Sequence, residues 1–159
     1  MTLRDDLGAA AKVRSAGHAD DQIRAVLDDF ALALRNKNAA AVIALLTDDA
    51  VIFDLAPPLA MGPEATHDPT PLQQWFDTWK GPIVSEGRDL DVVVGGDVAY
   101  AYCLRHLTGT KRDGEDVDMW FRATAGFRRE GGRWRITHMH NSVPFAMDGS
   151  DKALLDLKP

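Results

Sequence analysis

Four segments in the second half of the chain alternate apolar and polar residues with the period of a β-strand, and this pattern constrains the fold most. The segments cover residues 83–94, 98–110, 115–128 and 132–142. Short glycine-containing turns join them, at residues 95–97, 111–114 and 129–132. Turns of this kind connect neighbouring antiparallel strands. The pattern therefore predicts an antiparallel meander of four long strands.

The first half of the chain predicts three helices and one short strand. The helices are expected at residues 20–36, 39–46 and 70–81, and the strand at residues 50–54. Asp20 and Asp21 are placed to cap the first helix, and Pro71 suits the first turn of the third. Helices segregated from a run of strands indicate an α+β fold, in which the three N-terminal helices cover one face of a curved antiparallel sheet of four long strands plus one short.

Composition favours a soluble, acidic, single-domain protein. The chain has 159 residues, a net charge of -6 and 45% hydrophobic residues, and its lone Cys103 excludes an internal disulfide. The basic residues form no stripe along the chain, so we expect no nucleic-acid partner. No apolar run approaches the roughly 20 residues that a membrane span needs, so we expect no membrane association. We expect a cytoplasmic protein. Its expected parts are a loosely ordered extension at residues 1–19, the domain at 20–145 and a C-terminal tail at 146–159.

The last strand carries two histidines at its end, and regular alternation places both on one face. Trp134, Ile136, His138, His140 and Ser142 then share a face. Aligning the turns gives two inward rows, which are Leu90, Tyr102, Ala123 and His138, and then Arg88, Leu104, Phe121 and His140. Because Ala123 is small, we expect a cavity with a few polar groups on its wall. Alternatively, the strand simply leaves the core at this end, and its histidines form hydrogen bonds with neighbouring residues.

The opposite face of the predicted sheet also carries large side chains. It would present Trp120, Arg122, Thr124, Thr137, Met139 and Val143. Because the helices are already used on the inner face, a second copy of the chain is the expected cover. The pattern predicts a homodimer through the sheet, with Trp120, Arg122, Thr124, Met139 and Val143 at the interface.

Several motifs together resemble the ketosteroid-isomerase homologues, which are SnoaL-like proteins of the nuclear-transport-factor-like fold. The motifs are the Thr47-to-Phe53 strand, the Gly62-Pro-Glu-Ala65 loop, the Trp-rich third helix, Asp118 to Thr124 and Gly132 to Pro144. The resemblance covers residues 20–145 and implies a cone of bent sheet over helices, open onto a cavity and commonly dimeric. Relatives of this superfamily include isomerases, cyclases, dehydratases, hydrolases and the non-catalytic kinase association domain. The arginines that line that domain's pocket match Tyr102 and Ala125 here, which leaves Arg88 as the expected inward arginine.

The resemblance implies abstraction of a proton next to a carbonyl, with a donor for the enolate oxygen. His138 or His140 is the expected base, Asp54 is an alternative base, and Tyr102 is the expected donor. Ligand contacts are expected from Trp75, Trp79, Arg88, Leu104, Phe121, Ala123 and Ser142. Asp54 can instead cap a turn, and the two tryptophans or Tyr102 can belong to the core. With only Asp54 or His106 available as a third ligand beside the histidine pair, we expect neither a metal nor another cofactor.

The sequence leads to one hypothesis and one alternative. The hypothesis is a SnoaL-like protein that binds a small hydrophobic molecule, as an isomerase, cyclase or lyase. The alternative is a non-catalytic ligand-binding or dimerisation module like the kinase association domain. A catalytic site would place a base at an open cavity, whereas an assembly domain would fill the cavity with side chains.

Overall fold

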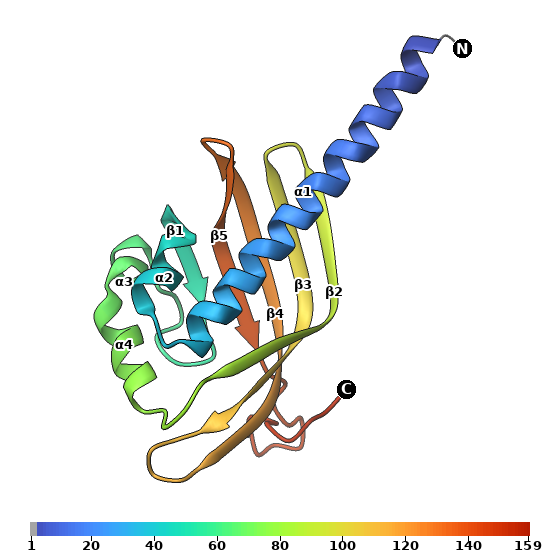
Figure 1. The fold of residues 1–159 in the computed structure, drawn as a ribbon. Helices are drawn as coiled ribbons and strands as arrows, with labels where there is room; N and C mark the ends of the chain where they lie inside the picture. The colour runs from blue at the N-terminus through green and yellow to red at the C-terminus, as the bar shows by residue number, and fades with distance from the viewer. Residues whose placement is uncertain (1–2) are drawn as a thin grey trace.

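A computed structural model describes residues 3–159, with side chains from Gly17 onward, and shows an α+β fold (Figure 1). The helices are α1 (Leu3–Arg35), α2 (Ala39–Ala44), α3 (Pro63–His67) and α4 (Pro69–Asp77). The strands are β1 (Leu46–Phe53), β2 (Val84–Gly95), β3 (Val98–Thr110), β4 (Asp116–Glu130) and β5 (Arg133–Ser142). No described helix is both long enough and apolar enough to cross a membrane.

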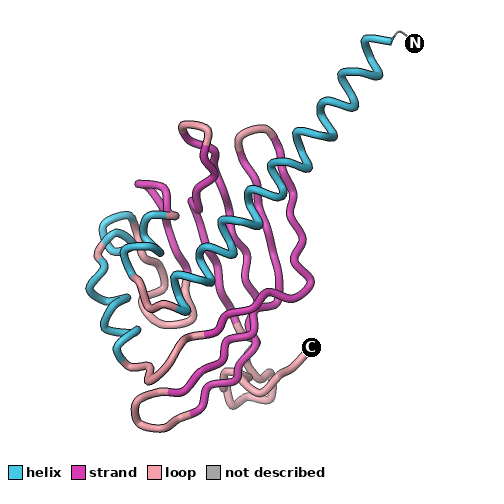
Figure 2. Tube along the Cα trace, viewed as in Figure 1, coloured by secondary structure: helices cyan, strands magenta, loops and turns pink. Residues whose placement is uncertain are grey.

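The five strands form one mixed sheet in the order β1-β5-β4-β3-β2. The antiparallel meander from β2 to β5 confirms the sequence prediction. β1 pairs with β5 in parallel at the edge of the sheet. The sheet is strongly bent, and the helices gather on one of its faces (Figure 2). We call the face that α1 covers the inner face, and the opposite one the outer face.

The helices differ from the sequence prediction at two points. Asp20 does not cap a helix, because it lies inside α1, where its carboxylate pairs with Arg24 at 2.7 Å. The segment between the predicted strand at 50–54 and the predicted helix at 70–81, where no helix was expected, contains the short helix α3. Asp68 then caps α4 by accepting a hydrogen bond from the Thr70 backbone N–H. Asp68 also ends α3, whereas Gly62 at the start of α3 forms no side-chain cap hydrogen bond.

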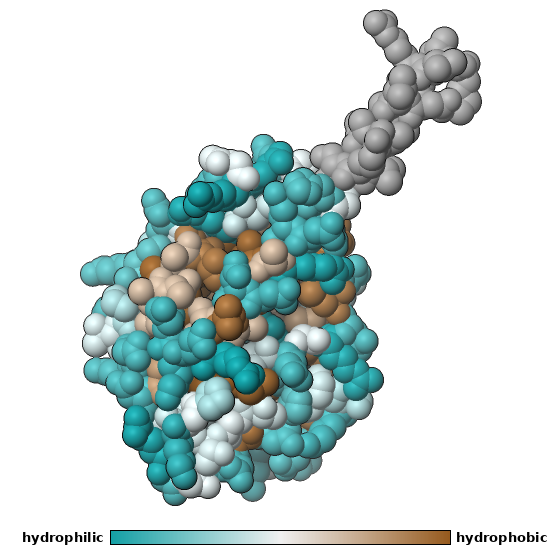
Figure 3. Space-filling model, in the orientation of Figure 1, coloured by the Kyte–Doolittle hydropathy of each residue, from teal (hydrophilic) through white to brown (hydrophobic). Residues whose placement is uncertain are grey.

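Two separate clusters of apolar side chains form the core, both on the inner face. The first cluster packs Ala19 and Ile23 of α1 against strands β3, β4 and β5. The strand residues include Ala101, Ala125, Phe127, Trp134, Ile136 and Met139. The second joins the end of α1 to α2 and α4, through Ala33, Leu34, Ala39, Val42, Phe76, Trp79 and Ile83. Phe30 of α1 packs against both clusters. The face that carries α1 is mostly hydrophilic, with hydrophobic residues around the C-terminal half of the helix (Figure 3).

The register between β3 and β4 differs from the prediction by one residue. Thr110 lies opposite Asp116, so Tyr102 lies opposite Thr124 and not opposite Ala123. A shift of one residue exchanges the two faces of a strand. Tyr102 and Leu104 therefore face outward, in contrast to the prediction, whereas Cys103 and Arg105 face inward. The burial agrees, because Tyr102 is 46% exposed and Arg105 is 8% exposed.

An extra residue in β2 corrects the prediction for Arg88. Arg88 lies opposite Leu104 and Asp91 lies opposite Tyr102, so β2 has one more residue than β3 over this stretch. Asp89 accommodates the bulge with a left-handed φ of 56°. Arg88 lies on the outer face, with its side chain 53% exposed and close to Asp89. It is not the inward arginine that the resemblance left available.

A second bulge, in β5, reverses the predicted faces of the two histidines. Phe127 lies opposite Ile136 and Gly126 lies opposite His138, which leaves Thr137 as the extra residue. After the bulge, His138, His140 and Ser142 face outward, and Met139 faces inward. Met139 is 9% exposed and belongs to the first core cluster, so it is not on the outer face where a dimer contact was expected.

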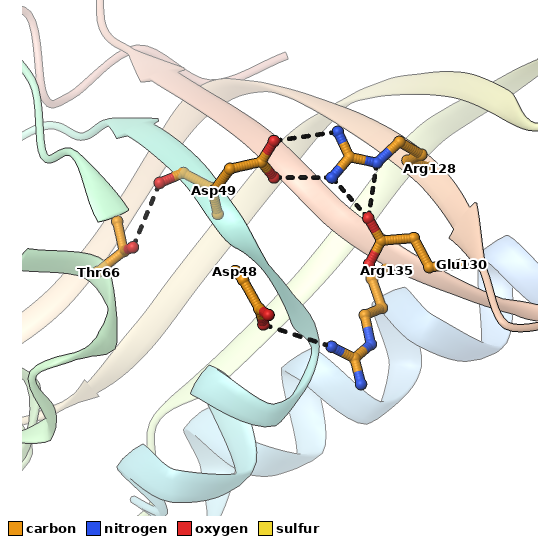
Figure 4. A network of polar contacts seen from close by, with 7 residues as sticks. Asp48, Asp49, Thr66, Arg128, Glu130 and Arg135 are labelled. Carbon is orange, nitrogen blue, oxygen red and sulfur yellow. Dashed lines mark hydrogen bonds and ion pairs between the residues drawn. The ribbon is translucent and has the colours of Figure 1, made fainter. Parts of the chain in front are cut away.

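A polar network holds β1 at the edge of the sheet (Figure 4). The Arg128 guanidinium of β4 reaches past β5 and pairs with Asp49 of β1 at 2.8 Å. It also pairs with Glu130. Arg135 of β5 lies 3.8 Å from Asp48. These contacts, on the exposed side of β1, fix the position of the strand whose end forms part of the site described next.

Candidate ligand-binding site

Three of the four predicted catalytic residues lie together where β1 and β5 end. Phe53 is at the centre of this group, with its ring 4.9 Å from the His138 ring and 5.7 Å from the His140 ring. The His138 Nδ1–H donates to the Val51 carbonyl at 2.7 Å, which leaves Nε2 as the basic atom. Asp54 follows Phe53 directly. The parallel pairing of β1 with β5 brings Asp54 and the histidines together, although they are far apart in sequence.

A groove of about 470 Å³ opens at the same place. We call it the mouth groove, and it is lined by Phe53, Asp54, Leu55, Ala56, Pro57, Pro58, Leu59, His140 and Asn141. Most of these side chains are apolar, and three are polar. A largely apolar hollow with a few convergent polar groups is the usual character of a small-molecule site.

Asn141 connects the mouth groove to the inner face of the sheet. Its Nδ2 donates to Asp54 Oδ1 at 3.0 Å, and the Leu55 backbone N–H donates to the same oxygen at 2.8 Å. Asn141 lies opposite Ala123, so it shares the inner face with that residue. Its Oδ1 is buried without a hydrogen-bond donor in the described structure. The groove therefore holds an oriented carboxylate and borders an unpaired buried acceptor.

Six residues on the inner face lie between the two core clusters and belong to neither. This inner patch consists of Gly87, Cys103, Arg105, Phe121, Ala123 and Asn141. Cys103, Phe121 and Ala123 are only half-buried. An added Cβ at Gly87 would lie 3.7 Å from Cys103 Sγ and 3.9 Å from Arg105 Nη1. The small residues thus leave the Arg105 guanidinium open on one side.

Burial determines the electrostatics of the inner patch. It lowers the pKa of the Arg105 guanidinium, and it raises the pKa of the Cys103 thiol, which Arg105 only partly offsets. The thiol is therefore neutral at physiological pH, while the guanidinium stays charged as arginines do. Among the described residues, no three histidine, cysteine, aspartate or glutamate side chains meet where they could hold a metal ion.

Tyr102 and the tryptophans do not join the site. Tyr102 lies on the outer face, where its hydroxyl donates to Asp91 at 2.6 Å, and this bond raises the pKa of Tyr102. Trp79 is 1% exposed in the second core cluster, with Trp75 packed beside it. The Lys111 ammonium lies 3.9 Å from the centre of the Trp79 ring. The core alternative is therefore correct for the tryptophans.

The remaining predicted residues divide between the two faces. Phe121 and Ala123 face inward as expected, whereas Leu104 and Ser142 face outward. Trp120, Arg122 and Thr124 face outward as expected, and Val143 follows β5 in a half-buried position. Their expected contact with a second copy stays a prediction.

Sequence reasoning missed Arg105, Cys103 and Asn141. Each of the three is next in sequence to a residue that was assigned to the inner face. The predicted alternation therefore placed all three on the outer face. A usable signal was present for Arg105, because it stands between Cys103 and Leu107 at the spacing of an apolar strand face. A charged residue in such a row is a candidate for a functional role.

Comparison with known families identifies the family of this chain. The SnoaL-like domain family matches residues 23–146. The chain belongs to the SnoaL-like family. An NTF2-like protein of unknown function from Pseudomonas putida KT2440 is 34% identical, with a TM-score of 0.79 over 91% of this chain and 99% of that one. No functionally curated protein matches this SnoaL-like chain.

Two less similar structures share the fold of this SnoaL-like protein. A candidate dehydratase of the NTF2-like family from Streptomyces avermitilis is 16% identical, with a TM-score of 0.71 over 82% of this chain and 99% of that one. A candidate calcium/calmodulin-dependent protein kinase II association domain from Xanthomonas campestris is 22% identical, with a TM-score of 0.66 over 80% and 86%. At these identities the likeness concerns the fold alone.

Proposed function

We propose that this SnoaL-like protein binds a small, mostly apolar molecule where the mouth groove meets the inner patch. The observation that carries the proposal is the groove itself, which combines apolar walls with Asp54, His140 and Asn141. Asn141 belongs to both the groove and the inner patch, so a ligand in the groove can reach the edge of the inner patch. The family supports the same reading, since the fold accommodates small-molecule-binding and isomerase-type domains.

We further propose an isomerase-type or lyase-type reaction with Asp54 as the base. The carboxylate is oriented by the Asn141 amide and the Leu55 backbone N–H, both bound to Oδ1. Its Oδ2 can accept a proton from a carbon next to a ligand carbonyl. His140 lines the same groove and can pass a proton to or from the product. Tyr102 has no part in this scheme, because it does not line the groove and its hydroxyl donates to Asp91.

Blocking the groove tests the binding proposal. The measurement is thermal shift of the protein with steroids, polyketide-like aromatics and small carboxylates. His140→Trp fills the groove from an exposed position, and Arg133→Trp adds the same bulk at the exposed far end of the same strand. We expect a ligand that raises the Tm of the wild type and of Arg133→Trp but not of His140→Trp. Equal shifts in all three proteins would place the ligand elsewhere.

A second variant separates catalysis from binding. Asp54→Asn removes the base and keeps the size and one acceptor oxygen of the side chain. For an enzyme, we expect the ligand found above to bind this variant within a few-fold of the wild type, while exchange of its α-protons with solvent, followed by NMR, falls by about 100-fold or more. If the wild type itself catalyses no exchange, the protein is a non-catalytic binding module.

A further inference from the structure

Arg105 is a buried arginine without a partner. Its side chain is 8% exposed, on the inner face, and it forms no ion pair and no hydrogen bond with any residue that the structure describes. Most other described arginines have a partner. These are Arg24 with Asp20, Arg88 with Asp89, Arg112 with the Asp77 carbonyl, Arg128 with Asp49, Arg129 with Asp97 and Arg135 with Asp48. Arg35, Arg122 and Arg133 have none, but water reaches them because they are exposed.

Among the described residues, no carboxylate lies within ion-pair distance of Arg105. The Cys103 thiol is neutral, as shown above, and Asp28 of α1 acts on the guanidinium only from a distance beyond an ion pair. Burying a charge without a partner opposes folding. A buried guanidinium that pairs with no described residue is free to bind a partner that is not part of the chain.

We propose that Arg105 binds the carboxylate of the small molecule that occupies the inner patch, which rests on the function proposed above. The planar guanidinium matches the two oxygens of a carboxylate. Phe121 lies directly opposite Arg105 on β4 and offers an apolar surface to the rest of the ligand. Among the side chains that the structure describes, Arg105 is the one cation of the patch, and Asp28 and Asp54 lie near the patch. A monoanion therefore fits this site better than a phosphate dianion.

The other unpaired group of the inner patch indicates the size and the far end of the ligand. Asn141 Oδ1 is a buried acceptor without a donor. Asn141 lies on β5 opposite Ala123, and Arg105 lies on β3 opposite Phe121. The two residues are therefore two strand spacings, about 10 Å, apart across the sheet and two residues, about 7 Å, apart along it. A small aromatic acid with a hydroxyl opposite its carboxylate spans this distance and satisfies both groups. The ligand class is thus a hydroxyaryl carboxylic acid.

The stability of the ligand-free protein gives the first test. Arg105→Met keeps the length of the side chain and removes the buried charge. We expect the Tm to rise by roughly 2–4 °C, because no ion pair with a described residue compensates that charge and Asp28 acts on it only from a longer distance. The control is Arg133→Met, which replaces an exposed arginine at the start of β5 and leaves Tm unchanged. A fall in the Tm of Arg105→Met would mean that Arg105 is structural, which overturns the proposal.

Calorimetric titration gives the second test, with three matched probes. They are 4-hydroxyphenylacetate, its uncharged amide and phenylacetate, which lacks the hydroxyl. In the wild type we expect the amide to bind about 10-fold to 100-fold more weakly than the acid, and in Arg105→Met we expect the two to bind alike. Loss of the hydroxyl weakens binding about 5-fold to 10-fold in the wild type and not in Asn141→Leu. Arg105→Lys keeps the charge and retains part of the preference for the acid.

The outcomes separate this inference from the proposed function. If neutral ligands bind the wild type and are blocked by His140→Trp, while the acid has no advantage over its amide, the groove is a binding site and the role of Arg105 is wrong. If acids bind Arg105→Met as tightly as the wild type, the role of Arg105 is again wrong. If no probe or panel compound binds the wild type, both proposals fall.

Discussion

At the scale of single residues, the Arg128 side chain reaches across a whole strand. It pairs with Asp49 at 2.8 Å and with Glu130. The Arg128 hydrogen bond is the main reason why the pKa of Asp49 falls from its ordinary value of 3.8 to about 2. Asp49 is therefore ionised over a wider pH range in the folded protein than in the unfolded chain.

We predict that this pair makes part of the stability depend on pH. Since the folded pKa is the lower one, the contribution is complete above about pH 4 and is lost as the pH falls from there to about 2. Asp49→Asn is expected to lower Tm slightly at neutral pH, because the pair is exposed. Thermal unfolding of both proteins from neutral pH to pH 2 checks this. The two Tm values should converge at the acid end, and a constant difference would contradict the assignment.

At the scale of elements, one extra residue in β5 determines which side chains reach the core. Alternation through Trp134 and Ile136 continues correctly up to Thr137 and reverses after it. The sequence contains no glycine or proline inside β5 that would mark the bulge. Its opposite residue, Gly126, has no side chain, and an added Cβ there would lie 3.6 Å from both His138 Cβ and Thr137 Cγ2. These are ordinary van der Waals distances, so Gly126 does not explain the bulge either, and the sequence carries no local signal for it.

Because of the bulge, we predict that Met139 contributes more to stability than His140, whereas regular alternation would predict the opposite. Met139→Ala removes a buried side chain of the first core cluster and should lower the free energy of unfolding by about 2–4 kcal/mol. His140→Ala changes an exposed position and should cost about 0.5 kcal/mol or less. Denaturant unfolding of the two variants checks this. A strand without the bulge would reverse the order of the two effects.

The elements themselves could be predicted from sequence, because period and turn residues are local signals. The four long strands and their antiparallel order are as predicted, and so are the helices around Ile23, Val42 and Trp75. The face that a side chain occupies depends on register, and a shift of one residue reverses it. The offset in the β3–β4 hairpin turned Tyr102 outward, the bulge in β2 did the same for Arg88, and the bulge in β5 did so for the two histidines. The grouping of Asp54 with the histidines was anticipated, whereas Arg105 was not.

At the scale of the whole molecule, the outer face leaves apolar side chains uncovered at one end. Val93, Val98, Tyr100 and Tyr102 are 41%, 57%, 48% and 46% exposed around the β2–β3 turn. The two tyrosine rings stack with their centres 6.3 Å apart. Exposed apolar residues that gather in one place on a sheet are typical of an interaction surface.

We predict that two copies associate through this face. Light scattering coupled to size exclusion should give the mass of two chains. Tyr100→Glu places a charge in the uncovered group and should shift the mass to that of one chain. Leu32→Glu changes a residue of α1 that is 54% exposed and should leave the dimer intact. A wild-type monomer, or a dimer that tolerates Tyr100→Glu, would contradict the predicted interface.

The separation of the core into two clusters has a consequence for how such a protein changes over evolutionary time. The side chains of the inner patch are packed into neither cluster, so replacing one of them disturbs few of the contacts that hold the helices on the sheet. Mutations can therefore alter the chemistry between the clusters while the framework persists.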